Sequence, residues 1–473
     1  MSATYKTAIH WFRRDLRLND NTALFHACKR AEDVIPVYVA SDWKESHRWT
    51  GPPRQAFLCG CLESLAKSLE TTGSRLIVRQ GAAVEELGKL IRETKADAVF
   101  FNRDPDPFGR ETERKVAELC SGFGIDLHAY KDAVLHEPDE VLNGSGAPYR
   151  VYTAYSKNWF GQPKPEPLGR PRKISTPSGI KSIGTPTLDF WKLPANQAAI
   201  VKPGERAGRN RLKKALTGPL LEYAERRDDP SSGANSSIGP DLRFGTISVR
   251  EVFHQTQQAA REAETDGRRK SLHIFLKQLA WREFYVAILG HYPNVLDESF
   301  APQWRDVPWG DADENFKRWK QGRTGFPIVD AGMRQLLATG YMHNRVRMIV
   351  AMFLTKDLHL HWRLGEAHFM RHLVDGEIAN NNGGWQWSAG TGADAAPYFR
   401  IQNPWTQTNR FDPHGEYIRA WVPELSKTDP KRFQKPPGAG PIANDYPLPI
   451  VDHKTERERT LEIFKQHRRT IDD

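Results

Sequence analysis

One stretch of the chain is unusually specific: Asp375-Gly-Glu-Ile-Ala-Asn-Asn-Asn-Gly-Gly-Trp-Gln-Trp387, followed closely by Ala395-Ala-Pro-Tyr-Phe-Arg-Ile-Gln-Asn-Pro404. It combines an acid, a run of Asn, a Gly pair and two Trp. Gly and Asn are weak helix formers, so the pattern argues against an ordinary helix. It favours a backbone that lies close to a flat ligand, with side-chain amides to bond the ligand's heteroatoms and indoles beside it.

Composition limits what the rest of the chain can be. The 473 residues carry 68 Lys and Arg against 58 Asp and Glu, a formal net charge of +10. This length predicts two domains, and the positive excess favours an anionic partner such as nucleic acid. The cysteines, Cys28, Cys59, Cys61 and Cys120, have neither the spacing of a zinc site nor the density of a disulfide scaffold, so we predict no metal site.

The N-terminus, Met1-Ser-Ala-Thr-Tyr-Lys6, lacks the apolar core of a signal peptide, and no apolar run is long enough to span a membrane. We therefore expect a soluble, cytoplasmic protein that makes no membrane contact, and we expect it to be a monomer.

The first part of the chain alternates between two kinds of segment. Short apolar runs, which predict strands, lie at 9–12, 34–39, 75–78, 98–101 and 125–127. Amphipathic stretches of helical length lie at 53–71, 82–94 and 111–121. This alternation predicts a parallel sheet covered by helices, whose ligands bind at the carboxyl ends of the strands. No Gly-x-Gly-x-x-Gly motif follows the first run, so an ordinary dinucleotide site is not expected there.

The second part of the chain has a different character. Residues 163–208 are rich in Pro, Gly, Ser and Lys, which predicts a surface linker. Beyond it, apolar residues recur at helical spacing at 271–289, 328–339, 345–357 and 365–374, and a charged helical stretch follows at 455–468. We therefore predict an all-helical second domain.

Three further segments complete the pattern. They are Phe12-Arg-Arg-Asp-Leu-Arg-Leu-Asn-Asp-Asn21, Gln278-Leu-Ala-Trp-Arg-Glu-Phe-Tyr285 and Tyr341-Met-His-Asn-Arg-Val-Arg-Met348. Together with the opening stretch they resemble the photolyase/cryptochrome family over nearly the whole chain, with most similarity to class I-type cyclobutane pyrimidine dimer (CPD) DNA photolyases. The resemblance implies an α/β N-terminal domain with a Rossmann-like parallel sheet, plus an all-α C-terminal FAD-binding domain, joined by a long linker.

The corresponding bounds are 1–132 for the antenna-binding α/β domain, 133–205 for the linker and 206–473 for the helical domain that binds FAD and the DNA lesion. The resemblance makes Asp375 the acid at the flavin ring edge, Arg347 its ion-pair partner and Asn381 the residue beside flavin N5. The other FAD contacts that it implies are Tyr223, Asn235, Ser236, Ser237, Ile238, Gly239, Phe275, Gly376 and Glu377. The loop 235–239 departs from the family's Thr-Ser-Arg-Leu-Ser, which affects individual contacts within it.

The resemblance also implies a lesion pocket, with Trp281 and Trp387 as the indoles against which a flipped dimer packs. The other DNA- or lesion-binding residues that it implies are Arg227, Gln278, Asn344, Arg345, Met348 and Gln407. The run around Asn344 matches enzymes that split CPDs, because (6-4) photoproduct enzymes carry paired His there. Gln278 replaces a Glu that is common in bacterial CPD photolyases, so we expect reduced efficiency or altered substrate handling.

Two electron- and light-related features follow from the same resemblance. Trp385, Trp362 and Trp309 match a photoreduction chain that runs from the flavin to the surface. A second, light-harvesting chromophore is expected in the first domain, with 8-hydroxy-deazaflavin favoured and with a plain flavin or an empty site as alternatives. Its candidate contacts are Arg54, Asp106 and Arg110.

The predicted function is light-driven repair of CPDs in UV-damaged DNA by an electron from excited, reduced FAD. The alternative is a cryptochrome-type photoreceptor without repair activity. Asn381, Asn344, the two pocket indoles and the lack of a long tail argue against that alternative, whereas Gln278 argues weakly for it. A bare nucleic-acid-binding module leaves the flavin segment unexplained.

Overall fold

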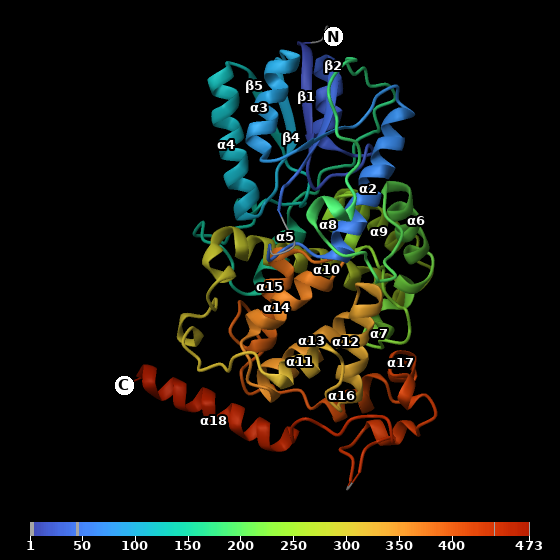
Figure 1. Ribbon diagram of the computed structural model, residues 1–473, viewed down its shortest axis with the longest axis vertical. Coiled ribbons are helices and arrows are strands. Elements are labelled where there is room, and N and C mark those ends of the chain that lie inside the picture. The colour runs from blue at the N-terminus through green and yellow to red at the C-terminus, as the bar shows by residue number, and fades with distance from the viewer. Residues whose placement is uncertain (1–3, 44–46, 439, 473) are drawn as a thin grey trace. The chain divides into compact units, whose positions relative to one another are not determined.

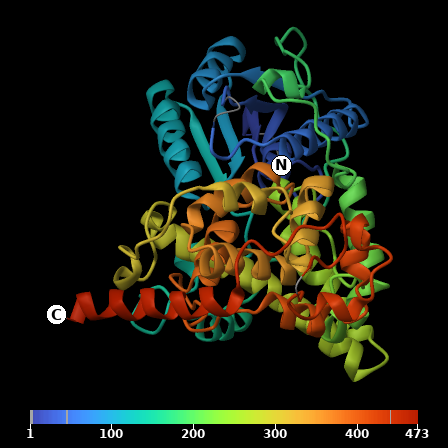
Figure 2. The same ribbon diagram turned by 60° about the horizontal axis from the view of Figure 1, so that its bottom comes forward.

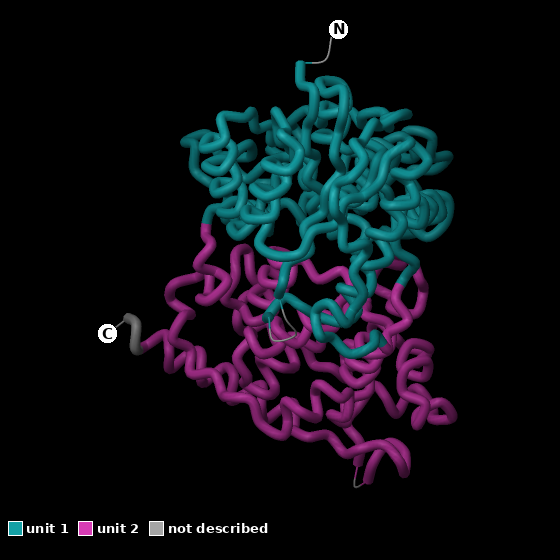
Figure 3. The backbone as a smooth tube through the Cα atoms, turned by 45° about the horizontal axis from the view of Figure 1, so that its top comes forward, with its two compact units in different colours: residues 1–196, 201–224, 236–291 teal, residues 197–200, 225–235, 292–473 magenta. Residues whose placement is uncertain are grey.

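The computed structural model describes residues 4–43, 47–438 and 440–472. It divides into two compact units (Figure 3). Unit 1 comprises residues 1–196, 201–224 and 236–291, and unit 2 comprises residues 197–200, 225–235 and 292–473. The predicted domain bounds, 1–132, 133–205 and 206–473, stay a prediction. Within the described residues, no helix is both long and apolar enough to cross a membrane.

Unit 1 contains a five-stranded sheet in the order β3-β2-β1-β4-β5, with every neighbouring pair parallel (Figure 1). The strands are β1 (Tyr5–Phe12), β2 (Ala31–Ala40), β3 (Ile77–Gln80), β4 (Ala98–Asn102) and β5 (Asp126–Tyr130). Each covers or adjoins an apolar run of the sequence, so the predicted parallel α/β fold is confirmed. The order reverses between β1 and β4, which is where such sheets usually bind ligands.

The helices of unit 1 cover the sheet and continue beyond it. Those that follow the strands are α1 (Thr22–Arg30), α2 (Pro52–Glu70), α3 (Ala83–Thr94) and α4 (Pro107–Phe123). The later ones are α5 (Tyr152–Gly161), α6 (Glu205–Leu216), α8 (Gly239–Phe244), α9 (Val249–Glu262) and α10 (Asp266–His291). Leu87 of α3 and Val116 of α4 share one core with Ile9, Val37 and Val99 of the sheet.

The segment predicted to be a surface linker is more buried than expected. Between residues 163 and 204 it has little regular structure, but Ile174, Ile180 and Trp191 are buried. Thr176 and Ser74 share a hydrogen bond of 2.7 Å, and Arg75 donates to the Ile180 carbonyl. These contacts hold the segment along unit 1, where polar composition alone predicted a solvated chain.

Unit 2 is helical, as predicted. Its helices are α11 (Glu314–Lys320), α12 (Pro327–Thr339), α13 (Asn344–Met352), α14 (Trp362–His372), α15 (Ile378–Ala389), α16 (Pro404–Phe411), α17 (Glu416–Trp421) and α18 (His453–Asp472). A π-helical turn, η6 (Phe353–Asp357), continues α13. The short α7 (Tyr223–Arg226) lies where the chain passes from unit 1 to unit 2. Figure 2 shows α18 as a long straight helix that ends at the C-terminus.

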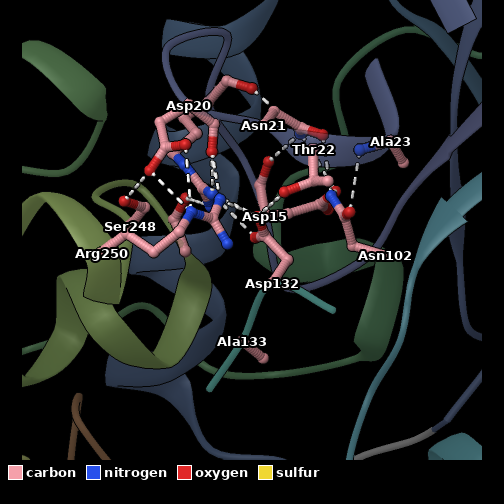
Figure 4. A network of polar contacts seen from close by, with 12 residues as sticks. Asp15, Asp20, Asn21, Thr22, Ala23, Asn102, Asp132, Ala133, Ser248 and Arg250 are labelled. Carbon is pink, nitrogen blue, oxygen red and sulfur yellow. Dashed lines mark hydrogen bonds and ion pairs between the residues drawn. The ribbon is translucent and has the colours of Figure 1, made fainter. Parts of the chain in front are cut away.

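The segment 12–21, which begins at the end of β1, is bonded to the end of β4 by a network of polar contacts (Figure 4). Asn102, the last residue of β4, donates to Asp15 at 2.6 Å and to Asn21 at 2.8 Å. Arg17 bonds both carboxylate oxygens of Asp132, at 2.7 and 2.8 Å. The network therefore connects this segment both to β4 and to Asp132, which follows β5.

Arg250 of α9 extends the network, with bonds to Asp132 at 2.6 Å and to Asp20 at 3.1 Å. Arg17, Arg250 and Asp132 are at most 3 % exposed. Burial opposes the charge of Asp132, but Arg17 and Arg250 outweigh it, so the pKa of Asp132 is held below its usual value. The segment therefore joins the sheet to α9 through paired, buried charges.

Candidate functional site

The Asp375 carboxylate, which precedes α15, is held by one arginine. Arg347 Nη2 lies 2.8 and 3.1 Å from its two oxygens, while Arg347 Nε donates to the Met342 carbonyl at 2.8 Å. The Asp375 side chain is 13 % exposed and that of Arg347 is 25 % exposed. The structure thus contains a fixed, partly accessible carboxylate; its role toward a flavin stays a prediction.

The Asn run and the Gly pair lie inside a regular helix, α15, which the residue propensities argued against. Asn382 Nδ2 donates to the Val295 carbonyl at 2.9 Å and to Glu366 Oε1 at 3.0 Å, and Asn381 Nδ2 donates to the Glu366 carbonyl at 3.0 Å. These side chains bond neighbouring segments instead of competing for their own backbone. Tertiary contacts therefore override the weak helix propensity of Asn.

One side of α15 is open. Asn380, Gly384 and Trp387, at helical spacing, are exposed or half-buried, as is Asn381, whereas Trp385 is buried. A methyl group placed on Gly384 would meet open space. This side therefore offers amides, an indole and uncrowded backbone, shortly after a fixed carboxylate in the chain. Such groups suit a planar heterocycle. The residues present therefore fit a flavin.

The other predicted FAD contacts are divided between the units. In unit 1 the rings of Tyr223 and Phe275 meet edge to face with centroids 5.8 Å apart. Ser236, Ser237 and Ile238 precede α8, and Ser237 takes a left-handed conformation with φ of 52°. Gly239 begins α8. In unit 2, Asn235 ends the segment 225–235, while Gly376 and Glu377 are buried between Asp375 and α15.

Trp281, on α10, is backed by a residue that the sequence did not reveal. Tyr152 of α5 stacks on it with centroids 3.6 Å apart and an angle of 8° between the planes. The Tyr152 hydroxyl donates to the Lys277 carbonyl at 2.9 Å. Gln278 Nε2 bonds the Ile274 carbonyl of its own helix, at 3.4 Å. No spacing in the sequence links Tyr152 to Trp281, because the contact joins two distant segments.

The remaining predicted DNA-binding residues lie in unit 2. Asn344 is the exposed first residue of α13, and Arg345 and Met348 follow it on the same helix. Gln407 is half-buried on α16, and Arg227 is half-buried in the segment 225–235. Trp387 lies on the open side of α15.

His343 caps α13 by accepting from the Arg345 backbone N–H at 3.2 Å. Burial lowers the pKa of His343 to about 4 despite the nearby Asp228 carboxylate. The imidazole is therefore neutral at neutral pH, which suits a capping role and gives no acid for proton transfer.

The three predicted redox tryptophans share the hydrophobic core of unit 2, which contains Trp362 and Trp385 and packs against Trp309. His361 lies between two of them, with ring centroids 6.1 Å from Trp309 and 5.5 Å from Trp362. Within the described residues, the indole N–H groups of all three are buried without a hydrogen-bond partner. The sequence did not single out Trp319, whose centroid is 6.1 Å from that of Trp385.

The candidate antenna residues lie on α2 (Arg54), at the N-cap of α4 (Asp106) and on α4 (Arg110), and a pocket opens just beyond the end of β4. A pocket of about 360 Å³ there is lined by Arg103, Asp104, Arg110, Glu113, Glu137, Asp139 and Glu140. Asp106 caps α4 by accepting from the Gly109 N–H, and burial, with the charge of Asp104 next in size, raises the pKa of Asp106 to about 6. Arg54 is buried and donates to the Trp49 carbonyl. Only Arg110 of the three predicted contacts lines this pocket.

Comparisons with known proteins agree along the chain. Residues 8–172 match the family model described as DNA photolyase, and residues 275–466 match the FAD binding domain of DNA photolyase. The deoxyribodipyrimidine photo-lyase of Synechococcus sp. is 38 % identical over 471 residues, which cover 98 % of this chain and 97 % of that protein.

Solved structures match as fully. A bacterial class III photolyase from Agrobacterium tumefaciens is 38 % identical, with a TM-score of 0.92 over 99 % of both chains. A cryptochrome from Synechocystis sp. is 27 % identical, with a TM-score of 0.89 over 98 % of this chain and 100 % of that one.

Proposed function

The chain belongs to the DNA photolyase family, and from this we propose that it splits cyclobutane pyrimidine dimers in DNA under blue light, with reduced FAD as electron donor. Its activity is that of a deoxyribodipyrimidine photo-lyase, the repair of pyrimidine dimers. One observation supports the proposal that FAD is the electron donor. The open side of α15, which carries Asn381 and Trp387, comes shortly after the fixed Asp375 carboxylate in the chain, and both lie inside the matched FAD-binding region.

When bound, FAD supplies a photoexcited electron that opens the cyclobutane ring and is afterwards returned. The chain's own side chains would orient the flavin. Asp375, fixed by Arg347, would hold an N–H edge of the ring. Asn381 uses its Nδ2 on the Glu366 carbonyl, which leaves its Oδ1 to accept from a flavin N–H.

The lesion side needs shape more than acid-base chemistry. Trp281 and Trp387 would form the apolar walls for a flipped dimer, whose damaged pairing lowers the cost of extrusion. Asn344 and Gln278 supply amide N–H donors for thymine carbonyls. Ring opening requires no proton, and the neutral His343 is in keeping with that.

Electron supply to the flavin would pass through Trp385, Trp362 and Trp309. Their buried indole N–H groups face no acceptor among the described residues, which supports transfer of an electron without loss of a proton. An antenna chromophore near Arg54, Asp106 and Arg110 is part of the proposal, with 8-hydroxy-deazaflavin favoured. The class I-type assignment is likewise a prediction, since the compared structure at 38 % identity is a class III photolyase.

Gln278 is the residue that argues for the photoreceptor alternative, because a neutral amide forms a weaker hydrogen bond with the dimer than a carboxylate does. Gln278→Glu is expected to lower the Kd for dimer-containing DNA by about fivefold, because a carboxylate that accepts from a thymine N–H forms a charge-assisted hydrogen bond, which exceeds a neutral one by about 1 kcal/mol. An unchanged Kd would remove Gln278 from the lesion contacts. Gln321→Glu, the same change at an exposed position at the end of α11, is the matched control.

The proposal as a whole is tested with UV-irradiated plasmid. Purified protein loaded with FAD is incubated with the plasmid in blue light or in darkness, and the remaining dimers are counted as sites cut by a dimer-specific endonuclease. For the wild type, we expect the endonuclease-sensitive sites to be lost in blue light and retained in darkness. For Trp387→Ala, we expect few of these sites to be lost in light. Equal site counts in light and darkness would favour the photoreceptor.

A further inference from the structure

Lys356 is a buried amine beside the outermost of the three predicted redox tryptophans. It is 1 % exposed and lies in the π-helical turn η6 of unit 2. Its Nζ lies 6.0 Å from the ring centroid of Trp309 and 3.9 Å from that of Phe464. The rings of Trp309 and Phe464 meet edge to face, with centroids 5.9 Å apart. Single π-helical turns are rare and are frequent at functional sites.

Backbone contacts fix both the amine and the indole. Lys356 Nζ donates to the carbonyl of Ala389, the last residue of α15, at 2.6 Å. The N–H of Gly310, which follows Trp309, donates to the His359 carbonyl at 2.7 Å. This second bond ties the Trp309 segment to the chain that follows η6. The distance between the amine and the indole is therefore set by the fold.

The amine has no compensating anion. Within the described residues no carboxylate forms an ion pair with Lys356, and burial lowers the pKa of Lys356 to about 7. Its charged and neutral forms are therefore both populated near neutral pH, where an ordinary lysine is fully charged. A positive charge close to an indole opposes the removal of an electron from that ring, because the oxidised ring is itself a cation. A neutral amine has no such effect.

The other titratable or charged groups near Lys356 and Trp309 are Asp357, His359, His361, His453, Glu456 and Arg459. Asp357 is bonded to His453 at 2.5 Å, and burial raises the pKa of Asp357 to about 6. His359 is bonded to Glu456 at 2.6 Å. Burial lowers the pKa values of His359 and His361 below their usual 6.5. Above about pH 7, Asp357 and these two histidines therefore keep one charge state while Lys356 changes its own.

We propose that Lys356 is a positioning residue of the electron supply, in which the charge on its amine sets how readily Trp309 gives up an electron. The inference rests on the proposed function, because it takes Trp385, Trp362 and Trp309 as the route of electrons to the flavin. Along that route Trp385 loses one electron to the light-excited flavin, Trp362 replaces it, and Trp309 replaces the electron of Trp362. An added thiol then returns one electron to Trp309, is oxidised to a disulfide and releases its proton to water.

The test follows the indole radical of Trp309 by transient absorption after a light flash, in protein loaded with oxidised FAD. The signal of interest is the part that Trp309→Phe removes. A unit charge 6.0 Å away changes the equilibrium for oxidising an indole by up to about 100-fold at an effective dielectric constant of about 20. For the wild type, we expect the radical yield at about pH 9 to exceed that at about pH 6 by about threefold or more.

Two substitutions fix the charge at this position. Lys356→Met is neutral at every pH and should give the high yield at both pH values, whereas Lys356→Arg stays charged and should give the low yield at both. A merely structural role would change both variants in the same direction. Lys465→Met, the same change at an exposed position on α18, is the matched control and should follow the wild type. If Lys356→Arg fails to fold, the comparison of the wild type with Lys356→Met at the two pH values decides alone.

The titration of Lys356 is also measured without light, by NMR of protein with isotope-labelled lysine, in which Lys356→Met assigns the signal by its loss. A midpoint near pH 7 is expected. A midpoint at the ordinary value of about 10.4, or equal radical yields for Lys356→Met and Lys356→Arg, would overturn the proposal. Repair by wild type reduced with dithionite needs no electron from Trp309, so its absence would show failure of the proposed function instead.

Discussion

At the scale of single residues, side chains of the proposed site are fixed by partners of their own. Asp375 is fixed by Arg347, Asn381 by Glu366 and Trp281 by Tyr152. Such fixed geometry reduces the entropy lost when a ligand binds. Tyr152 is the clearest case, because it covers the Trp281 face with nearly parallel rings.

Loss of this stack is therefore expected to weaken lesion binding. Tyr152→Leu should raise the Kd for dimer-containing DNA by about 2- to 12-fold, since an aromatic pair is worth about 0.5–1.5 kcal/mol beyond its buried area. Tyr152→Phe keeps the ring and should bind like the wild type. Fluorescence anisotropy in the dark measures both, with Tyr149→Leu as control for the surrounding cluster. Equal affinity of the leucine and phenylalanine variants would show that the stack has no role in binding.

At the scale of elements, apolar periodicity predicted the strands and eight of the helices, because burial in a sheet or a helix bundle leaves a regular pattern in the sequence. These helices are α2, α3, α4, α10, α12, α13, α14 and α18. Apolar periodicity did not predict that the Asn run of α15 is helical, since the bonds from Asn381 and Asn382 to Glu366 and Val295 come from other elements. The same limit applies to Tyr152. Its contact with Trp281 joins distant segments and leaves no spacing in the sequence.

The buried network around Asp132 joins three elements of unit 1. Asp132→Ala would leave Arg17 and Arg250 charged, buried and without this carboxylate, so we expect the free energy of unfolding to fall by about 3–5 kcal/mol. Chemical denaturation followed by circular dichroism measures the change. Glu118→Ala, which removes an exposed ion pair of α4, should change little. A loss at Asp132 no larger than that of the control would contradict a structural role for the network.

The contact between η6 and α18 predicts a pH dependence. Lys356 donates to the Ala389 carbonyl at 2.6 Å and lies over the Phe464 ring, and burial lowers its pKa from 10.5 to about 7. Between these values the unfolded chain binds a proton that the folded protein has lost, so the free energy of unfolding rises with pH.

The contribution is at most about 1.4 kcal/mol per pH unit. Lys356→Met should remove it, so that the difference in stability between wild type and variant changes between about pH 7 and pH 10. Lys465→Met, at an exposed position on α18, should run parallel to the wild type. A Lys356→Met curve parallel to the wild type would mean that Lys356 keeps its proton in the folded protein.

At the scale of the whole molecule, two features of the sequence indicate the function most directly. The net charge of +10 suits a polyanionic substrate, and residues 8–172 and 275–466 match the two family models of DNA photolyases. The chemistry asks the protein to position a flavin and a lesion, exclude water and supply electrons. In the proposed function, aromatic rings, side-chain amides and paired charges perform these tasks.

Light-driven repair can be followed in solution by the absorbance of the product. Purified protein with FAD bound and reduced is mixed with an oligothymidine that carries cyclobutane dimers, and the ultraviolet absorbance of thymine is followed. That absorbance returns only when the 5,6 double bonds are restored. We expect recovery under blue light and none in darkness. No recovery in light, with the flavin shown to be fully reduced, would contradict light-driven repair by this protein.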